Sequence, residues 1–163
     1  SEFWQRHLLD SAQLLRFGRE SGSWLDIGSG AGLPGLVIAV LRSDPITLVE
    51  PRKLRAEFLL RAAGELQLSN VTVEAHRVEA CRGVFDFISA RAVAKLSDLF
   101  EMAHHLAHRR TRWILPKGRS AANELAEARR SWQGQFRVEP SITAPDAAII
   151  VGSEVSARHK GRG

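Results

Sequence analysis

The stretch Leu25-Asp26-Ile27-Gly28-Ser29-Gly30-Ala31-Gly32-Leu33-Pro34-Gly35 decides the fold of this protein. Its apolar beginning predicts a strand over Trp24–Ile27, and the glycines that follow let the backbone turn sharply and approach a ligand closely. Pro34 stands where a helix can begin, because the first amides of a helix have no partner within it. The stretch therefore predicts a strand, a ligand-binding turn and a helix, in that order.

The rest of the chain continues this alternation of short β-branched runs and longer amphipathic stretches. Parallel strands joined by crossover helices follow from such an order. We expect an α/β, Rossmann-like, mostly parallel seven-stranded sheet with a C-terminal antiparallel hairpin, similar to the fold of class I methyltransferases. The expected strands span residues 24–27, 46–50, 71–75, 85–89, 112–115, 136–142 and 147–152, and the expected helices span residues 3–17, 34–41, 52–66, 93–106 and 121–132.

Apolar periodicity gives several of these helices a face that we expect to pack against the core. The predicted core-facing residues are Leu8, Leu9, Ala12 and Leu15 in the first helix, Leu54, Phe58, Ala62 and Leu66 in the third, and Val93, Leu96, Phe100, Ala103 and Leu106 in the fourth.

Length and composition indicate one core. The 163 residues, 44% of them hydrophobic, can fill a single domain over 1–163. Apolar runs such as residues 35–41 are far shorter than the roughly 20 residues of a membrane span, so we expect a soluble, cytoplasmic protein without a membrane partner. Cys81 is the single cysteine, which excludes an internal disulfide, and we expect it to be partly buried.

The charge balance is basic, with 23 Lys and Arg against 18 Asp and Glu. Arginine supplies most of the positive charge and suits bidentate phosphate contacts and stacking on bases. A polyanionic partner is consistent with this balance, but a formal charge of +5 is also common among proteins that bind no nucleic acid. Charge alone therefore leaves both classes open.

The flanking acids decide which ligand the turn binds. Gly30, Gly32 and Gly35 match the dinucleotide pattern G-x-G-x-x-G, so the glycines alone fit a nicotinamide cofactor and S-adenosylmethionine equally well. Asp26 would crowd a pyrophosphate but suits the positively charged amino acid end of S-adenosylmethionine, whereas Glu50 can accept hydrogen bonds from the ribose of either ligand. We interpret the turn as an S-adenosylmethionine site.

The segment 85–93 leaves the fourth strand at the rim where open α/β sheets bind ligands. It contains neither the Asn-Pro-Pro-aromatic motif common in methylation of exocyclic amines nor the cysteine nucleophile that methylation of a pyrimidine carbon demands. The N7 atom of guanine already carries a free lone pair, so its methylation needs positioning and electrostatics but no general base. An arginine-rich rim fits that chemistry.

Four segments together resemble the RsmG (GidB) family over Phe3 to about Val151: Arg6-His7-Leu8-Leu9-Asp10-Ser11, the turn ending in Leu33-Pro34-Gly35, Ser89-Ala90-Arg91-Ala92 and Leu115-Pro116-Lys117-Gly118. The resemblance implies S-adenosylmethionine-dependent methylation of guanosine N7 in the decoding region of 16S ribosomal RNA. It also implies the rRNA or the small ribosomal subunit as partner, and an association between loss of the modification and streptomycin resistance.

The resemblance also implies roles for individual residues. Arg91 and Lys117, at the ends of the fourth and fifth strands, would face the RNA as the catalytic residues, and Arg91 would also touch the cofactor. Arg6 and His7 would complete this rim. The cofactor-binding residues would be Asp26, Gly28, Gly30, Gly32, Leu33, Glu50, Val78, Glu79 and Arg91, with residues 77–79 bordering the adenine.

Three further expectations follow. His104, His105 and His108 lie on one predicted helix, but no Glu stands between them as a zinc protease requires, so we expect no metal site. We expect a monomer that is truncated before the helix 3–17, because family members carry more N-terminal sequence. The tail 153–163, with Arg158, His159, Lys160 and Arg162, is expected to be solvated.

Two other functions remain open. A small NAD(P)-binding oxidoreductase fits the literal glycine pattern, although Asp26 and the lack of room for a substrate domain oppose it. A noncatalytic adenosyl-binding RNA module would bind the same donor and RNA but release no S-adenosylhomocysteine.

Overall fold

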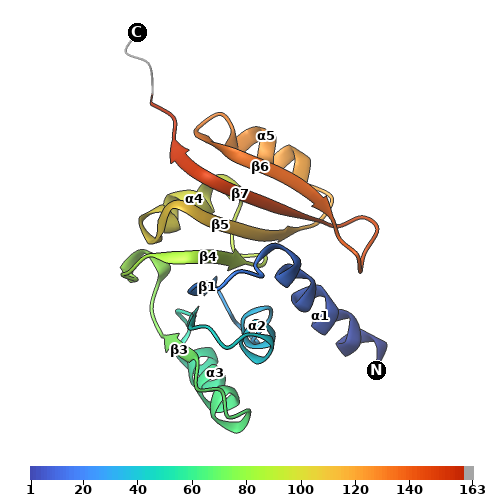
Figure 1. Ribbon diagram of the computed structural model, residues 1–163, viewed down its shortest axis with the longest axis vertical. Coiled ribbons are helices and arrows are strands. Elements are labelled where there is room, and N and C mark those ends of the chain that lie inside the picture. Colours follow the sequence, from blue (N-terminus) through green and yellow to red (C-terminus); the bar gives the residue numbers. More distant parts are fainter. Residues whose placement is uncertain (160–163) are drawn as a thin grey trace.

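The computed structural model describes residues 1–159 and contains one seven-stranded sheet, in the order β3-β2-β1-β4-β5-β7-β6 (Figure 1). Every strand pair among the first five is parallel, and β7 runs antiparallel to both of its neighbours. This is the predicted class, a mostly parallel α/β sheet with an antiparallel C-terminal hairpin. The strands are β1 (Trp24–Ile27), β2 (Ile46–Val49), β3 (Val71–Glu74), β4 (Phe85–Ala90), β5 (Ala107–Lys117), β6 (Trp132–Pro140) and β7 (Ala148–Ala157).

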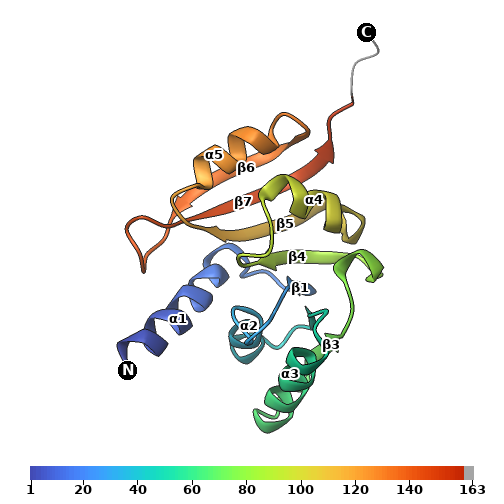
Figure 2. The same ribbon diagram turned by 180° about the vertical axis from the view of Figure 1, so that it is seen from behind.

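Helices cover both faces of the sheet (Figures 1 and 2). One buried cluster joins α4 and α5 to one face through residues such as Phe100, Leu125 and Trp113. The other cluster joins α2, α3 and the end of the first helical segment to the opposite face. The helices are α1 (Glu2–Ala12), α2 (Gly35–Leu41), α3 (Lys53–Glu65), α4 (Leu96–Ala103) and α5 (Ala121–Ala128), with short 3-10 helices η1 (Gln13–Phe17), η2 (Val78–Ala80) and η3 (His104–Leu106).

The order of the strands places the site. β1 pairs with β2 on one side and with β4 on the other, so the chain reverses direction across the sheet at β1. Open parallel sheets bind ligands at such a switch point, outside the carboxyl ends of the strands. The glycine turn that follows β1 lies at this point.

The face predicted for α3 is wrong except at Ala62, which packs partly buried against the core. The buried residues are Ala56, Leu59 and Ala63, whereas Leu54 is 78% exposed and Phe58 and Leu66 are also exposed. Residues four apart drift by about 40° at each step around a helix, so a long run of such spacings cannot stay on one face. Small alanines make up much of the buried face, and the pattern of large residues did not reveal it.

The face predicted for the first helix is only partly right. Leu8 and Leu9 are exposed, whereas Leu15 is partly buried against the core. The helix becomes a 3-10 helix at Gln13, where Leu14 and Phe17 are buried. α1 extends away from the sheet along most of its length (Figure 1), so only its end reaches the core. The 3-10 winding then turns a different set of side chains inward.

Several predicted boundaries differ from those of the structure. The fourth helix begins at Leu96 rather than residue 93, and α5 ends at Ala128, which leaves Trp132 to open β6 as a buried residue. α4 ends at Ala103, so the three histidines do not share a helix, because His108 already belongs to β5.

The predicted tail begins too early. β7 continues to Ala157, and the Arg158 amide donates a 2.8 Å hydrogen bond to the Ser131 carbonyl. Lys160 and Arg162 lie outside the described residues. Within residues 1–159, no helix combines the length and apolar character that crossing a bilayer demands.

Candidate active site

The glycine turn after β1 has the left-handed backbone that its glycines allow. Gly28, Gly30 and Gly32 have φ values of 68°, 49° and 96°, a region that side chains rarely tolerate. The amides of Gly28 and Ser29 donate to the Val49 carbonyl over 2.8 and 3.1 Å. These bonds fix the turn against the end of β2, next to Glu50.

Asp26 lies beneath this turn, and its carboxylate is wholly buried. The Ser29 hydroxyl donates to Oδ2 over 2.8 Å, the Ser89 hydroxyl donates to Oδ1 over 2.7 Å, and the Gly35 amide also donates to the carboxylate. Burial raises the pKa of Asp26 to about 6 despite these bonds. The structure thus places Asp26 as a support of the turn, and the direct contact predicted with the donor stays a prediction.

Glu50 follows β2 directly and is fully buried. Its Oε2 accepts a 2.9 Å hydrogen bond from the Arg52 amide and lies 3.4 Å from the Arg52 guanidinium, but Oε1 has no hydrogen-bond partner among residues 1–159. A Cβ added to Gly30 would lie 3.9 Å from Oε1, so this oxygen borders the turn. A buried carboxylate oxygen without a donor is costly unless a ligand supplies one.

The segment predicted to border the adenine forms η2, after the end of β3. Val78 is buried in the same core cluster as α4, whereas Glu79 is exposed. Leu33 is half-buried within the turn, and its peptide bond to Pro34 is cis. The contacts predicted between these residues and the donor stay predictions.

A cleft of about 760 Å³ is lined by the loop 91–95 and by Pro34 of the glycine turn. Its walls come from α1, from that loop, from the end of β5 with the start of α5, and from the loop 141–147 between β6 and β7. Its charged lining residues are Arg6, Asp10, Arg91, Lys95, Lys117 and Glu124. The predicted RNA-facing residues Arg91 and Lys117 therefore line one cavity, together with Arg6.

Arg91 reaches from the end of β4 to α1. Its guanidinium lies 3.2 Å from Nδ1 of His7, and the His7 ring packs edge-on against Phe3 at 4.4 Å. The structure thus brings the Arg6-His7 segment to the predicted rim. A guanidinium has five N–H donors, so the contact with His7 leaves donors for a charged ligand.

Lys117 is already engaged within the protein. Its side chain is 9% exposed, and the ammonium donates to the Ala94 carbonyl over 3.0 Å and lies 3.0 Å from Oε1 of Glu124. Glu124 also accepts from the Leu96 amide and the Ser120 hydroxyl. Lys117 thus ties the end of β5 to the loop 91–95 and to α5, and its predicted contact with RNA stays a prediction.

The loop 91–95 contacts both the glycine turn and the cleft. A Cβ on Gly28 would lie only 2.6 Å from Cγ2 of Val93, so Val93 covers this glycine. Ala92 has a φ of 50°, a left-handed conformation that costs an alanine on the order of 1 kcal/mol. The loop is therefore held in a defined shape between the two halves of the site.

A polar network that the sequence did not reveal joins α1 to the loop 141–147. The Gln13 amide donates to the hydroxyls of Ser141 and Thr143 over 3.1 and 3.2 Å, and the Thr143 hydroxyl donates to Asp10. More than 120 residues separate these partners along the chain, so no local pattern could have paired them. The network fixes two walls of the cleft to each other.

Residues 1–148 match the family described as "GidB: rRNA small subunit methyltransferase G". The chain belongs to this family. The protein named Ribosomal RNA small subunit methyltransferase G of Rhizorhabdus wittichii is 49% identical over 164 residues, which cover 98% of this chain and 76% of that protein. The protein of the same name from Novosphingobium aromaticivorans is 52% identical over 154 residues, covering 91% of this chain and 67% of that protein.

Solved structures show the same fold in more distant methyltransferases. The glycopeptide N-methyltransferase MtfA complexed with S-adenosyl-L-methionine superposes with a TM-score of 0.76 at 11% identity, over 90% of this chain and 93% of that one. The ribosomal protein L11 methylase of Lactobacillus delbrueckii subsp. bulgaricus gives a TM-score of 0.72 at 15% identity, over 93% and 77% of the two chains. Membership of the methyltransferase G family decides against the nicotinamide-dependent oxidoreductase.

Proposed function

We propose that this protein transfers a methyl group from S-adenosylmethionine to N7 of a guanosine in 16S ribosomal RNA, presented as RNA or within the small ribosomal subunit. One observation carries the proposal: the loop 91–95 lies against the glycine turn through Val93 and also lines the arginine-rich cleft, and Pro34 of the turn lines the same cleft. A methyl donor at the turn and a base in the cleft would therefore meet at this loop. The relatives' names supply the class of RNA.

The residues at the turn fit S-adenosylmethionine. Oε1 of Glu50 is buried without a donor, and a ribose hydroxyl is a donor of the right kind. Gly30 leaves its part of the turn open, because a Cβ there would meet nothing nearer than 3.6 Å, whereas Val93 lies over Gly28 and Leu36 over Gly32. A ligand can therefore approach the backbone closely at Gly30. When bound, the donor supplies an electrophilic methyl group on a sulfonium.

The acids of the cleft favour N7 over a target that must lose a proton. Asp10 accepts a hydrogen bond from Thr143, and Glu124 is held by Lys117, Ser120 and the Leu96 amide. Neither carboxylate is free to serve as a general base. Guanine N7 needs none, because its lone pair forms the new N–C bond while the S–C bond breaks and the positive charge passes to the base.

The basic lining of the cleft suits an RNA substrate. Arg6 and Lys95 are exposed at its rim, and Arg91 points its guanidinium toward α1 at the same rim. Arginine forms bidentate contacts with phosphate and stacks on bases, which would hold a flipped guanosine and its backbone. The role of Arg91 is therefore to position the RNA, and the role of Lys117 is to hold the loop that Arg91 begins.

The test is transfer of labelled methyl groups from S-adenosylmethionine to 16S RNA and to small subunits that lack the modification. We expect label in the RNA and a mapped N7-methylguanosine. Binding of donor and RNA without release of S-adenosylhomocysteine would support the noncatalytic module instead. Label on any atom other than guanine N7 would refute the proposed target while leaving the methyltransferase assignment intact.

A further inference from the structure

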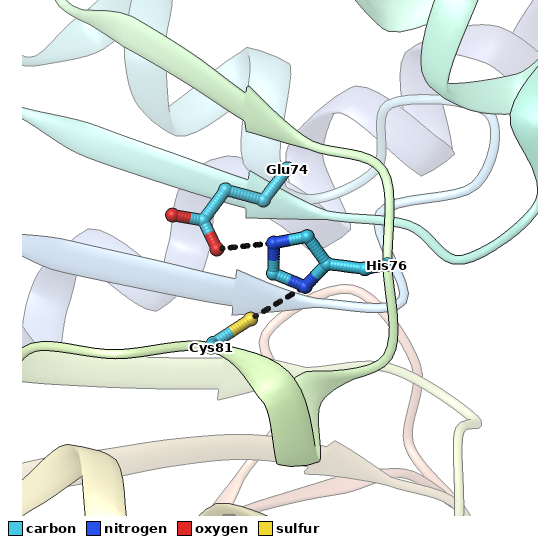
Figure 3. A group of neighbouring side chains, drawn as sticks. All are labelled: Glu74, His76 and Cys81. Atoms are coloured by element: carbon cyan, nitrogen blue, oxygen red, sulfur yellow. Dashed lines mark hydrogen bonds and ion pairs between the residues drawn. The ribbon is translucent and has the colours of Figure 1, made fainter.

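A cysteine, a histidine and a glutamate meet between β3 and β4, outside the cleft (Figure 3). Glu74 ends β3, His76 follows two residues later, and Cys81 comes directly after η2. Nε2 of His76 lies 3.2 Å from Oε2 of Glu74, and Nδ1 of the same ring lies 3.6 Å from Sγ of Cys81. One ligand-type atom from each residue lies within 4.8 Å of the other two.

We propose that Glu74, His76 and Cys81 bind a divalent transition metal ion of the zinc class. Thiolate, imidazole and carboxylate are the three protein ligands of zinc, and a cysteine excludes magnesium and calcium as the preferred ion. Tetrahedral bonds of about 2.0–2.3 Å put ligand atoms roughly 3.3–3.8 Å apart. Since the atoms lie within 4.8 Å of one another, the widest pair must contract by at most about 1.5 Å.

The histidine can supply a nitrogen that faces both partners. Each ring nitrogen contacts one of them, so the edge of the ring between the two nitrogens, which carries Cε1, faces the thiol and the carboxylate together (Figure 3). A half-turn of the imidazole about its Cβ–Cγ bond brings Nε2 to the place of Cε1. The His76 side chain is 44% exposed, so this rotation and entry of the ion meet little obstruction.

The surroundings favour a cation over the hydrogen-bonded arrangement alone. Glu74 and Glu79 both act electrostatically on the Cys81 sulfur, and Cys81 is buried. The Arg77 carbonyl lies 3.1 Å from Nδ1 of His76 and 3.7 Å from Sγ of Cys81, which offers an oxygen near the fourth position. Binding releases the thiol proton to solvent, and the resulting thiolate together with the Glu74 carboxylate neutralises the two charges of the ion.

The experiment uses the full chain, reduced and metal-free, titrated with Co²⁺ and Zn²⁺. We expect one Co²⁺ ion to bind with the thiolate-to-cobalt charge-transfer absorption, and Zn²⁺ to displace it and raise the melting temperature. Cys81→Ser should abolish the absorption, and His76→Gln and Glu74→Gln should each weaken Zn²⁺ binding at least about tenfold. His76→Gln keeps the test valid if the buried Cys81→Ser variant fails to fold.

His108→Gln is the matched control. His108 pairs with Asp86 at 2.8 Å, an exposed imidazole–carboxylate pair of the same kind without a thiol beside it. This variant should bind Zn²⁺ as tightly as the wild type. The proposal fails if the wild type shows no charge-transfer absorption, or if His76→Gln and Glu74→Gln bind Zn²⁺ as tightly as the wild type.

Discussion

The hydroxyl of Ser89 donates a 2.7 Å hydrogen bond to Oδ1 of Asp26, so β4 supports the carboxylate that lies beneath the glycine turn of β1. Ser89 in turn accepts a 2.8 Å hydrogen bond from the indole N–H of Trp24. This buried chain links the two central strands at the point where the donor site begins. The Asp26 carboxylate in this chain is removed from solvent, and this burial makes the stability of the protein depend on pH.

The first prediction concerns the dependence of stability on pH. Burial raises the pKa of Asp26 to about 6. Between about pH 4 and pH 6 the carboxyl is therefore mostly protonated in the folded protein but already ionised in the unfolded chain. The contribution of Asp26 to the free energy of unfolding is therefore fully present at low pH and is lost as the pH rises through 6. From pH 5 to pH 8, Asp26→Asn should gain roughly 1.4 kcal/mol relative to the wild type, measured by denaturant unfolding.

Asp86→Asn provides the control of opposite sign. The hydrogen bond from His108 and that from the Ser23 amide hold the pKa of the Asp86 carboxyl below its ordinary value. This carboxylate stabilises the fold above its unfolded pKa, so its removal should not produce a relative gain as pH rises from 5 to 8. Equal pH profiles for Asp26→Asn and the wild type would show that Asp26 is not desolvated as described.

The second prediction concerns donor affinity. Glu50→Gln keeps an acceptor for the Arg52 amide but removes the charge of the unpartnered oxygen at the turn. Hydrogen bonds to a charged group contribute about 1.5–3 kcal/mol, so S-adenosylmethionine should bind roughly 10- to 150-fold more weakly by calorimetry. Glu57→Gln, an exposed position on α3, should bind the donor like the wild type. An unchanged dissociation constant for Glu50→Gln would remove Glu50 from the donor site.

The central strands could be predicted because their signals are local. The glycine turn places the end of β1 at Ile27 and the start of α2 near Pro34, since few other sequences allow that backbone. Glu50 could be placed for the same reason: it follows a short β-branched run directly, and the ends of neighbouring parallel strands meet at one rim.

Features set by tertiary packing could not be predicted. The buried face of α3 depends on which side meets β2 and β3, and alanines there carry too little hydrophobic signal to reveal it. The family resemblance implies that Lys117 faces the RNA, yet its ammonium donates to the carbonyl of Ala94, which is distant in sequence. Contacts of this kind depend on the fold as a whole, so composition and periodicity do not contain them.

The third prediction separates RNA positioning from donor binding at Arg91. Arg91→Ala should lower methyl transfer roughly 100-fold while the dissociation constant of S-adenosylmethionine changes little, because the guanidinium lines the cleft and not the glycine turn. It should also reduce the slope of log affinity for RNA against log salt by about 1. Arg109→Ala is the control, since Arg109 lies near the opposite end of β5 from Lys117 and is 83% exposed. Lost donor affinity with intact RNA binding would overturn the assignment.

The last prediction treats Lys117 as a residue that holds the loop 91–95 in place. Lys117→Met removes the cation that pairs with Glu124 over 3.0 Å and also the donor to the Ala94 carbonyl. The variant should be destabilised by roughly 2 kcal/mol, because the largely buried Glu124 carboxylate loses its partner. Adding Glu124→Gln removes the unpaired charge and should recover about half of that loss, while transfer stays low because Ala94 remains untethered. Denaturant unfolding and single-turnover methyl transfer on the two variants measure both effects. Recovery of transfer in step with stability would show that Lys117 serves the fold alone, whereas low transfer in a restabilised protein would place it among the residues that shape the site.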